Sequence, residues 1–203
     1  MFVQVIQGRT SDEEGLRAAS QRWVKELASD ATGWLGSTLG VTDDGRAVAI
    51  IRFESAAAAQ RNSERPEQGQ WWEQTSRLFD GDVTFLDSED VTVDVVGDPN
   101  QAGFVQVMQG QVTDPARAKE LMGRIPSEEM AAFRPDVLGS LSVGHDEGRW
   151  TMVLYFTSEA DAREGERKEP PPEWQAVMAE MGELDAGPTD YLDLRRPVLE
   201  SPG

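Results

Sequence analysis

The chain contains no cysteine, a single histidine and few basic residues among its 203 positions. The lack of cysteine excludes disulfides, thiolate catalysis and cysteine-based metal or iron–sulfur sites. The 19 Lys and Arg residues face 37 Asp and Glu residues, so the net charge is -18. A surface this negative repels phosphate backbones and anionic headgroups, and we therefore expect neither nucleic acid nor a membrane as a partner.

Long apolar runs are also missing. No stretch approaches the roughly 20 residues that span a bilayer. The opening segment, 1–8, has no basic stretch before its short apolar run and no small-residue cleavage site, so it does not resemble a signal peptide. These absences predict a cytoplasmic protein, and the 38% hydrophobic content is enough for a globular core.

The strongest positive signal is an internal repeat. Residues 2–8 (FVQVIQG) recur as residues 104–110 (FVQVMQG), and the turn at 43–46 (DDGR) recurs at 146–149 (DEGR). Because the spacing between matching segments is nearly constant, the pattern indicates a duplication. It predicts a first repeat at 1–96, a linker at 97–103 and a second repeat with a C-terminal tail at 104–203.

Each repeat has the pattern of a β-α-β-β-α-β unit. An alternating segment is followed by an amphipathic one, and an Asp-Gly turn then joins two strands into a hairpin. Ser55 and Ser158 are expected to cap the helices that follow, and Pro126 is expected to end or kink a helix of the second repeat. The sequence therefore predicts the α+β class: two ferredoxin-like repeats with antiparallel sheets packed as a pseudo-dimeric α+β barrel.

The opening FVQV strand, the segment 62–72 (NSERPEQGQWW) and this order of elements resemble the dimeric α+β barrel superfamily. Within it, the chain is similar to the antibiotic biosynthesis monooxygenase family in tandem duplication. The resemblance implies a cofactor-independent oxygenase of an aromatic, quinone-like or polyketide-like molecule, with dioxygen as the second partner. Family enzymes use an Asn and a Trp four residues apart, whereas Trp71 and Trp72 follow Asn62 at nine and ten positions.

The resemblance makes Asn62 the candidate catalytic residue, as the donor of a hydrogen bond to a phenolate. A pocket is expected between the helices and the sheet, where aromatic walls and neutral polar groups can orient a flat ligand. The candidate substrate-binding residues are Gln4, Trp34, Trp71 and Trp72. Because Gly165 stands opposite Asn62 in the second repeat, a site is expected in the first repeat only.

Each candidate also has a purely structural explanation. Trp34, like Trp23, can simply fill the core, since a buried Trp removes a large apolar area from water. Asn62 can cap a helix end, and Gln4 can bond Gln106 or backbone across the pseudo-dyad. Two adjacent tryptophans are not expected to face inward together, so one residue of the pair at 71–72 is expected at a pocket mouth or a partner.

Metal and cofactor sites are not expected. His145 lies in a hairpin turn and is expected to be exposed, and the acidic cluster at 87–90 (DSED) is expected to be ordinary surface. The alternative to an oxygenase is a non-catalytic ligand-binding or stress-associated α+β barrel. Whether the intrachain pseudo-dimer forms a further homodimer is left open.

Overall fold

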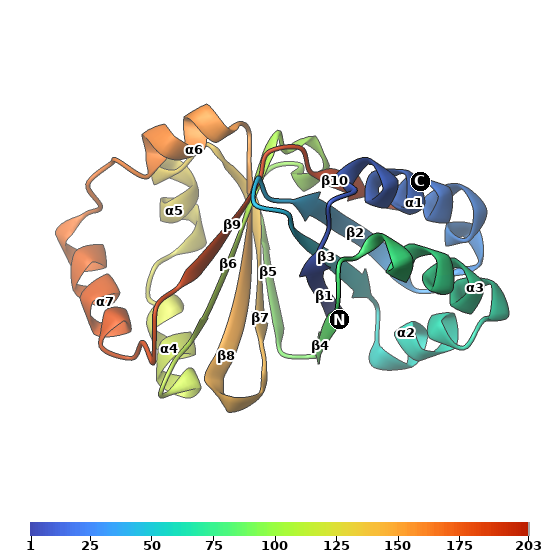
Figure 1. Cartoon of the computed structure of the whole chain (residues 1–203). Coiled ribbons are helices and arrows are strands. Elements are labelled where there is room, and N and C mark those ends of the chain that lie inside the picture. Colours follow the sequence, from blue (N-terminus) through green and yellow to red (C-terminus); the bar gives the residue numbers. More distant parts are fainter. Residues whose placement is uncertain (203) are drawn as a thin grey trace. The chain divides into compact units, whose positions relative to one another are not determined.

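The computed structural model describes residues 1–202 and divides the chain into two compact units. The first unit contains residues 1–91 and 193–203, of which the last is not described, and the second contains residues 92–192. The helices of each unit cover one face of its sheet (Figure 1). The predicted α+β class with two ferredoxin-like repeats is therefore confirmed.

The first repeat follows the predicted element order. Its strands are β1 (Phe2–Arg9), β2 (Trp34–Val41), β3 (Arg46–Phe53) and β4 (Thr84–Ser88), and its α-helices are α1 (Glu13–Glu26), α2 (Ala56–Ser63) and α3 (Pro66–Thr75). Short 3₁₀ turns follow α1 at 28–30 and α3 at 76–78. The second helical segment is thus broken in two, and Pro66 starts the second piece at a position where its missing N–H costs little.

The second repeat has the same order. Its strands are β6 (Phe104–Gln111), β7 (Val137–Gly144), β8 (Arg149–Phe156) and β9 (Asp190–Leu194), and its α-helices are α4 (Pro115–Met122), α5 (Ser127–Phe133), α6 (Glu159–Gly165) and α7 (Pro172–Gly182). Pro126 lies between α4 and α5, which confirms that it interrupts the helical segment. Two further strands, β5 (Val91–Val95) and β10 (Val198–Glu200), and two 3₁₀ turns at 99–101 and 146–148 complete the described elements.

Each sheet takes one edge strand from the other half of the chain. The first sheet has the order β10-β2-β3-β1-β4, and the second has the order β5-β7-β8-β6-β9. The C-terminal β10 pairs antiparallel with β2, with Val198 opposite Leu39. The compact units therefore differ from the sequence repeats, 1–96 and 104–203, by the exchange of β5 and β10.

Side-chain caps begin the helices, as predicted. Ser55 Oγ accepts a hydrogen bond from the Ala58 backbone N–H at 3.2 Å, and Ser158 Oγ accepts one from that of Asp161 at 3.1 Å. In the first hairpin Gly45 has φ +80°, which is the left-handed conformation that the Asp-Gly turn predicted. These local signals fix where each helix begins and where the chain reverses between β2 and β3.

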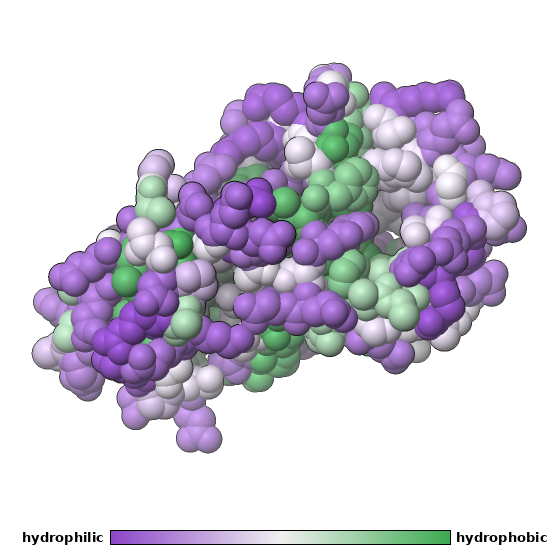
Figure 2. Space-filling view, turned by 90° about the horizontal axis from the view of Figure 1, so that it is seen from below, coloured by the Kyte–Doolittle hydropathy of each residue, from purple (hydrophilic) through white to green (hydrophobic). Residues whose placement is uncertain are grey.

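The surface is mainly hydrophilic, as the composition requires. Polar and charged side chains cover most of the face shown in Figure 2, and hydrophobic side chains show between them. Within residues 1–202, no helix is long and apolar enough to cross a membrane. The same residues contain no cluster of three or more His, Asp or Glu side chains arranged to hold a metal ion.

His145 does not fit the prediction of an exposed turn residue. Its ring is partly buried: Nε2 lies 3.0 Å from the hydroxyl of the buried Thr151, and Nδ1 is buried with no partner within residues 1–202. Burial lowers the pKa of His145 below its ordinary value of 6.5, and the charge of Arg149 lowers it further, while Asp146 opposes the shift. Burial in this loop thus disfavours the charged form of the imidazole.

This burial makes stability depend on mildly acidic pH. We expect the free energy of unfolding to decrease as the pH falls below 6.5, because the unfolded chain then binds a proton that the folded His145 resists. The neutral His145 ring contributes fully to the free energy of unfolding above pH 6.5. This contribution is lost as the pH falls through the lower pKa of His145 in the folded state. Urea unfolding between about pH 7.5 and pH 5 measures it, and a His145→Gln variant with the same slope as wild type would contradict the assignment.

Candidate functional site

A cavity of about 290 Å³ lies in the first unit, between the sheet and the helices. Strands β1, β2 and β3 supply its floor, and α1, α2 and α3 supply its walls. Its lining is mostly apolar and aromatic, with amides and hydroxyls between the rings. The size and lining suit a flat organic ligand of two or three rings.

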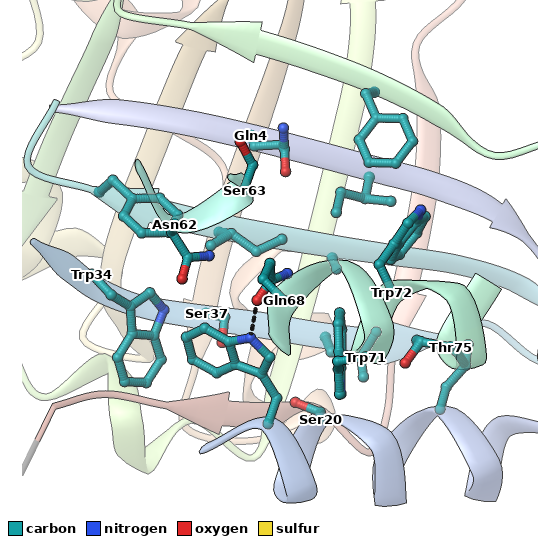
Figure 3. A pocket seen from close by; sticks show the side chains of 18 of the residues that line it. Gln4, Ser20, Trp34, Ser37, Asn62, Ser63, Gln68, Trp71, Trp72 and Thr75 are labelled. Carbon is teal, nitrogen blue, oxygen red and sulfur yellow. Dashed lines mark hydrogen bonds between the residues drawn. The ribbon is translucent and has the colours of Figure 1, made fainter. Parts of the chain in front are cut away.

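All five predicted site residues line this one cavity (Figure 3). Gln4 reaches it from β1, Trp34 from β2 and Asn62 from α2, while Trp71 and Trp72 reach it from α3. The structure thus brings together residues that are up to 68 positions apart in the sequence. Their roles in binding or catalysis belong to the proposal below.

Trp71 and Trp72 both line the cavity and are both only partly buried, so the cavity does not exclude either ring, and Trp72 is the one of the pair that lies toward the pocket mouth. Trp71 Nε1 donates to the backbone oxygen of Ala19 on α1 at 3.0 Å, which anchors that ring between α3 and α1. Trp72 extends the other way and packs edge-to-face on Phe85 at 5.3 Å. Phe85 lines the cavity and is 45% exposed, so the lining reaches the surface on this side.

Trp23 and Trp34 are core residues that also line the cavity. A role in the core therefore does not exclude a position at the cavity wall. Their rings pack edge-to-face at 5.0 Å, and both side chains are buried. Trp23 Nε1 donates to Gln68 Oε1 at 2.6 Å, the bond dashed in Figure 3. Trp34 Nε1 is buried without a hydrogen-bond partner within the described residues, which leaves a donor beside the cavity unused.

Asn62 does not cap a helix with its side chain. It is 8% exposed, and its Oδ1 accepts a hydrogen bond from Arg65 Nη1 at 3.0 Å. A guanidinium only donates, so the atom that faces Arg65 must be the oxygen of the amide. The amide nitrogen is left as the donor on the cavity side, where Figure 3 shows it turned toward the other cavity residues.

Gln4 is oriented in the opposite sense. Its Nε2 donates to Asp87 Oδ1 at 2.9 Å, and Gln4 and Asp87 are direct cross-strand partners on β1 and β4. Asp87 is thus a partner of the Gln4 amide nitrogen within the first unit, and a bond from Gln4 to Gln106 or to backbone across the pseudo-dyad stays a prediction. The Gln4 oxygen is turned toward the cavity residues in Figure 3 and is available as an acceptor.

The cavity contains no ionisable side chain among the described residues that line it. Its polar groups are neutral amides, hydroxyls and indole N–H groups, and the charged residues Arg65 and Asp87 act on it only through Asn62 and Gln4. Such a lining can orient an aromatic ligand and stabilise charge on its oxygen, but it supplies no general base of its own. Any proton that the ligand loses must pass to water.

Sequence reasoning missed several residues of the lining. On α3 the missed residues Gln68 and Thr75 lie three or four positions from Trp71 and Trp72, so they share one face of the helix. This spacing could have identified them once the helix was placed. Phe79 follows Thr75 by four positions and continues the same apolar spacing, whereas Phe85 comes from β4 and no periodic signal connects it to α3.

The second repeat does not reproduce the site at the position of Asn62. A Cβ added to its counterpart, Gly165, would lie 2.3 Å from Arg134 Nε, so the guanidinium already occupies this space. Arg134 forms an ion pair of 2.7 Å with Asp136, and its carbon Cζ lies 5.6 Å from the centre of the Phe156 ring. A charged, filled arrangement therefore replaces the amide.

The counterpart of Trp71 is also a packing residue in the second repeat. Trp174 is 4% exposed and packs edge-to-face on Phe133 at 5.4 Å. Where Trp34 stands in the first repeat, the second has Val137, and Gln175 stands in place of Trp72. The aromatic lining of the first repeat is thus largely absent from the corresponding positions of the second.

Comparison with known proteins gives matches among solved structures. No protein-family model and no curated protein matches the sequence. A proposed monooxygenase from Lactobacillus acidophilus NCFM superposes with a TM-score of 0.73 at 16% identity, covering 100% of this chain and 97% of its own. A proposed monooxygenase from Fusobacterium nucleatum superposes with a TM-score of 0.77 at 14% identity, covering 100% of this chain and 94% of its own.

A third structure, of an anthrone oxidase-like protein, superposes with a TM-score of 0.67 at 11% identity, covering 100% of this chain and 91% of its own. Because all three matches extend over both repeats, the shared feature is the whole tandem arrangement. At these identities the likeness concerns the fold. The chain therefore has the tandem ferredoxin-like fold of monooxygenase-like proteins, which confirms the fold that the resemblance in its sequence implied.

Proposed function

We propose that the first unit is a cofactor-independent oxygenase of a flat, phenolic or quinone-like small molecule. The observation that carries the proposal is the apolar cavity in which the Asn62 amide is held with its nitrogen toward the ligand space. The names of structures with the same fold, two proposed monooxygenases and an anthrone oxidase-like protein, support this class of reaction.

The chemistry needs little from the protein. An anthrone-type substrate that has lost a proton is electron-rich and can reduce dioxygen itself. A carbon–oxygen bond then forms at the activated CH₂ group, and loss of water leaves a ketone, so that substrate and O₂ give quinone and H₂O. The protein orients the ring against the tryptophans that line the cavity, donates from Asn62 to the oxyanion and excludes bulk water.

The absence of an ionisable group from the described cavity lining favours a second candidate, a non-catalytic protein that binds the same ligands. The two functions share the cavity and differ in turnover. In the binding protein the ligand would keep its protons and leave unchanged. Oxygen consumption therefore distinguishes them, and ligand binding alone does not.

The test is oxygen uptake and tryptophan fluorescence during titration with anthrones, naphthols and hydroquinones, without added metal or flavin. We expect ring binding to quench the fluorescence of the cavity tryptophans and at least one anthrone to consume oxygen. A Ser37→Phe variant should lose both signals, because the new ring enters the cavity from β2. The same change at the exposed Ser201 is the control.

The outcomes separate the hypotheses. If ligands quench the fluorescence of wild type but not of Ser37→Phe, and no compound causes oxygen uptake, the result supports the non-catalytic binding protein. No quenching by any compound in the panel would reject both functions for this cavity. Oxygen uptake that persists in the Ser37→Phe variant would place the reaction elsewhere in the chain.

A further inference from the structure

Arg65 lies behind the cavity and outside its lining. It precedes α3, where α2 and α3 meet, and its side chain is 18% exposed. Its Nη1 donates to Asn62 Oδ1 at 3.0 Å and to the backbone oxygen of Leu27 at 3.2 Å. The guanidinium is thus fixed between the C-terminal end of α1 and the Asn62 amide.

The charge of Arg65 is only weakly compensated. Its nearest carboxylate, that of Asp30, is 76% exposed and lies 3.8 Å from Nη2, so solvent screens this pair. The partly buried positive charge therefore acts mainly on the amide that it contacts. A donor bonded to the amide oxygen also polarises the amide and makes its N–H groups better donors.

We propose that Arg65 is a positioning residue that acts through Asn62 to favour the ionised form of a phenol bound in the cavity. The inference rests on the proposed function, because it assigns the phenol oxygen of the ligand to the Asn62 amide. In this step the O–H bond breaks, its electron pair stays on oxygen and the proton passes to water. Arg65 holds the amide nitrogen toward the oxygen and adds positive charge behind it.

The experiment measures the pKa of a bound phenol. The probe is 4-nitro-1-naphthol, whose phenolate absorbs visible light, and its methyl ether reports binding without ionisation. We expect binding to wild type to lower the pKa of the naphthol by about one unit, as a nearby opposite charge does for an ionisable group. The readout is the phenolate absorbance against pH with protein in excess.

Three arginine variants distinguish the effect of the Arg65 charge on the pKa of the bound naphthol from the effect of its hydrogen bond and from that of a distant positive charge. Arg65→Lys keeps the charge and a donor, and it should retain most of the shift. Arg65→Gln keeps a neutral donor, and it should lose most of the shift while binding the methyl ether with unchanged affinity. Arg61→Gln removes a positive charge from the exposed side of α2 and should leave the shift intact.

A second arm leaves Arg65 in place. Asn62→Asp still offers Arg65 an acceptor, but its carboxylate faces the ligand oxygen, so the pKa of the bound naphthol should rise above its value in solution. An unchanged shift in either Arg65→Gln or Asn62→Asp would overturn the proposal, as would equal losses in Arg65→Lys and Arg65→Gln. Failure of wild type to bind either probe would instead reject the proposed function and this inference together.

Discussion

Replacing Asn62 with Ala is expected to lower the rate of oxygen uptake with an anthrone by about a hundredfold or more. The change removes the amide donor that Arg65 holds toward the ligand space. Loss of one preorganised donor to a developing oxyanion typically costs about 10²–10³ in kcat. The measurement is the initial rate at saturating substrate, compared with wild type in an oxygen electrode.

The other asparagine of the chain provides the matched control. Asn100 is exposed and lies in the 3₁₀ turn before β6, outside the cavity, so Asn100→Ala should retain the wild-type rate. If Asn62→Ala instead keeps its kcat and only raises KM, the amide binds substrate and transition state equally. That result would remove Asn62 from the chemistry and leave it as a binding residue.

The largest effect on stability is expected in the second repeat. Replacing Arg134 with Ala should lower the free energy of unfolding by about 3–5 kcal/mol, because it leaves the buried carboxylate of Asp136 without its partner. The side chains of Arg134 and Asp136 are 16% and 7% exposed, and their nearest atoms are 2.7 Å apart. Urea unfolding followed by far-UV circular dichroism measures the change.

Two further variants test the reason for this loss. Changing Arg134 to Met and Asp136 to Leu together removes both charges, and it should recover most of the lost stability. Arg77→Ala breaks an ion pair whose side chains are both 71% exposed, and it should cost at most about 1 kcal/mol. If Arg134→Ala costs no more than Arg77→Ala, the buried pair does not hold the second repeat together.

The sequence was sufficient for features that depend on local chemistry. The caps at Ser55 and Ser158 and the interruption at Pro126 each follow from residue types at short separation. The repeat follows from the likeness of segments such as 2–8 and 104–110. Strand partners could not be predicted in this way, because the alternation of apolar and polar residues in a strand identifies its two faces but not the strand beside it. Nothing in the three residues of β10 indicates that they pair with β2, which lies more than 150 positions earlier.

The candidate site was predictable as a set of residues but not as an arrangement. Gln4, Trp34 and Asn62 were identified from their residue types and from a resemblance, and the fold brings them to one cavity. Their orientation depends on Asp87 and Arg65, whose contacts arise only when β4 lies beside β1 and α3 starts next to α2. Long-range pairing therefore sets which atom each amide presents.

The exchange of edge strands bears on how this chain can evolve. In an ancestor made of two separate copies, either copy could be lost or replaced without breaking a covalent link. Here a fragment that stops at residue 96 would carry β5 without the sheet it joins and would leave the outer side of β2 bare. Each half of the chain therefore supplies a strand that completes the other sheet. The second repeat can differ from the first at the positions that line the cavity and still be needed, because β10 at its C-terminal end completes the first sheet.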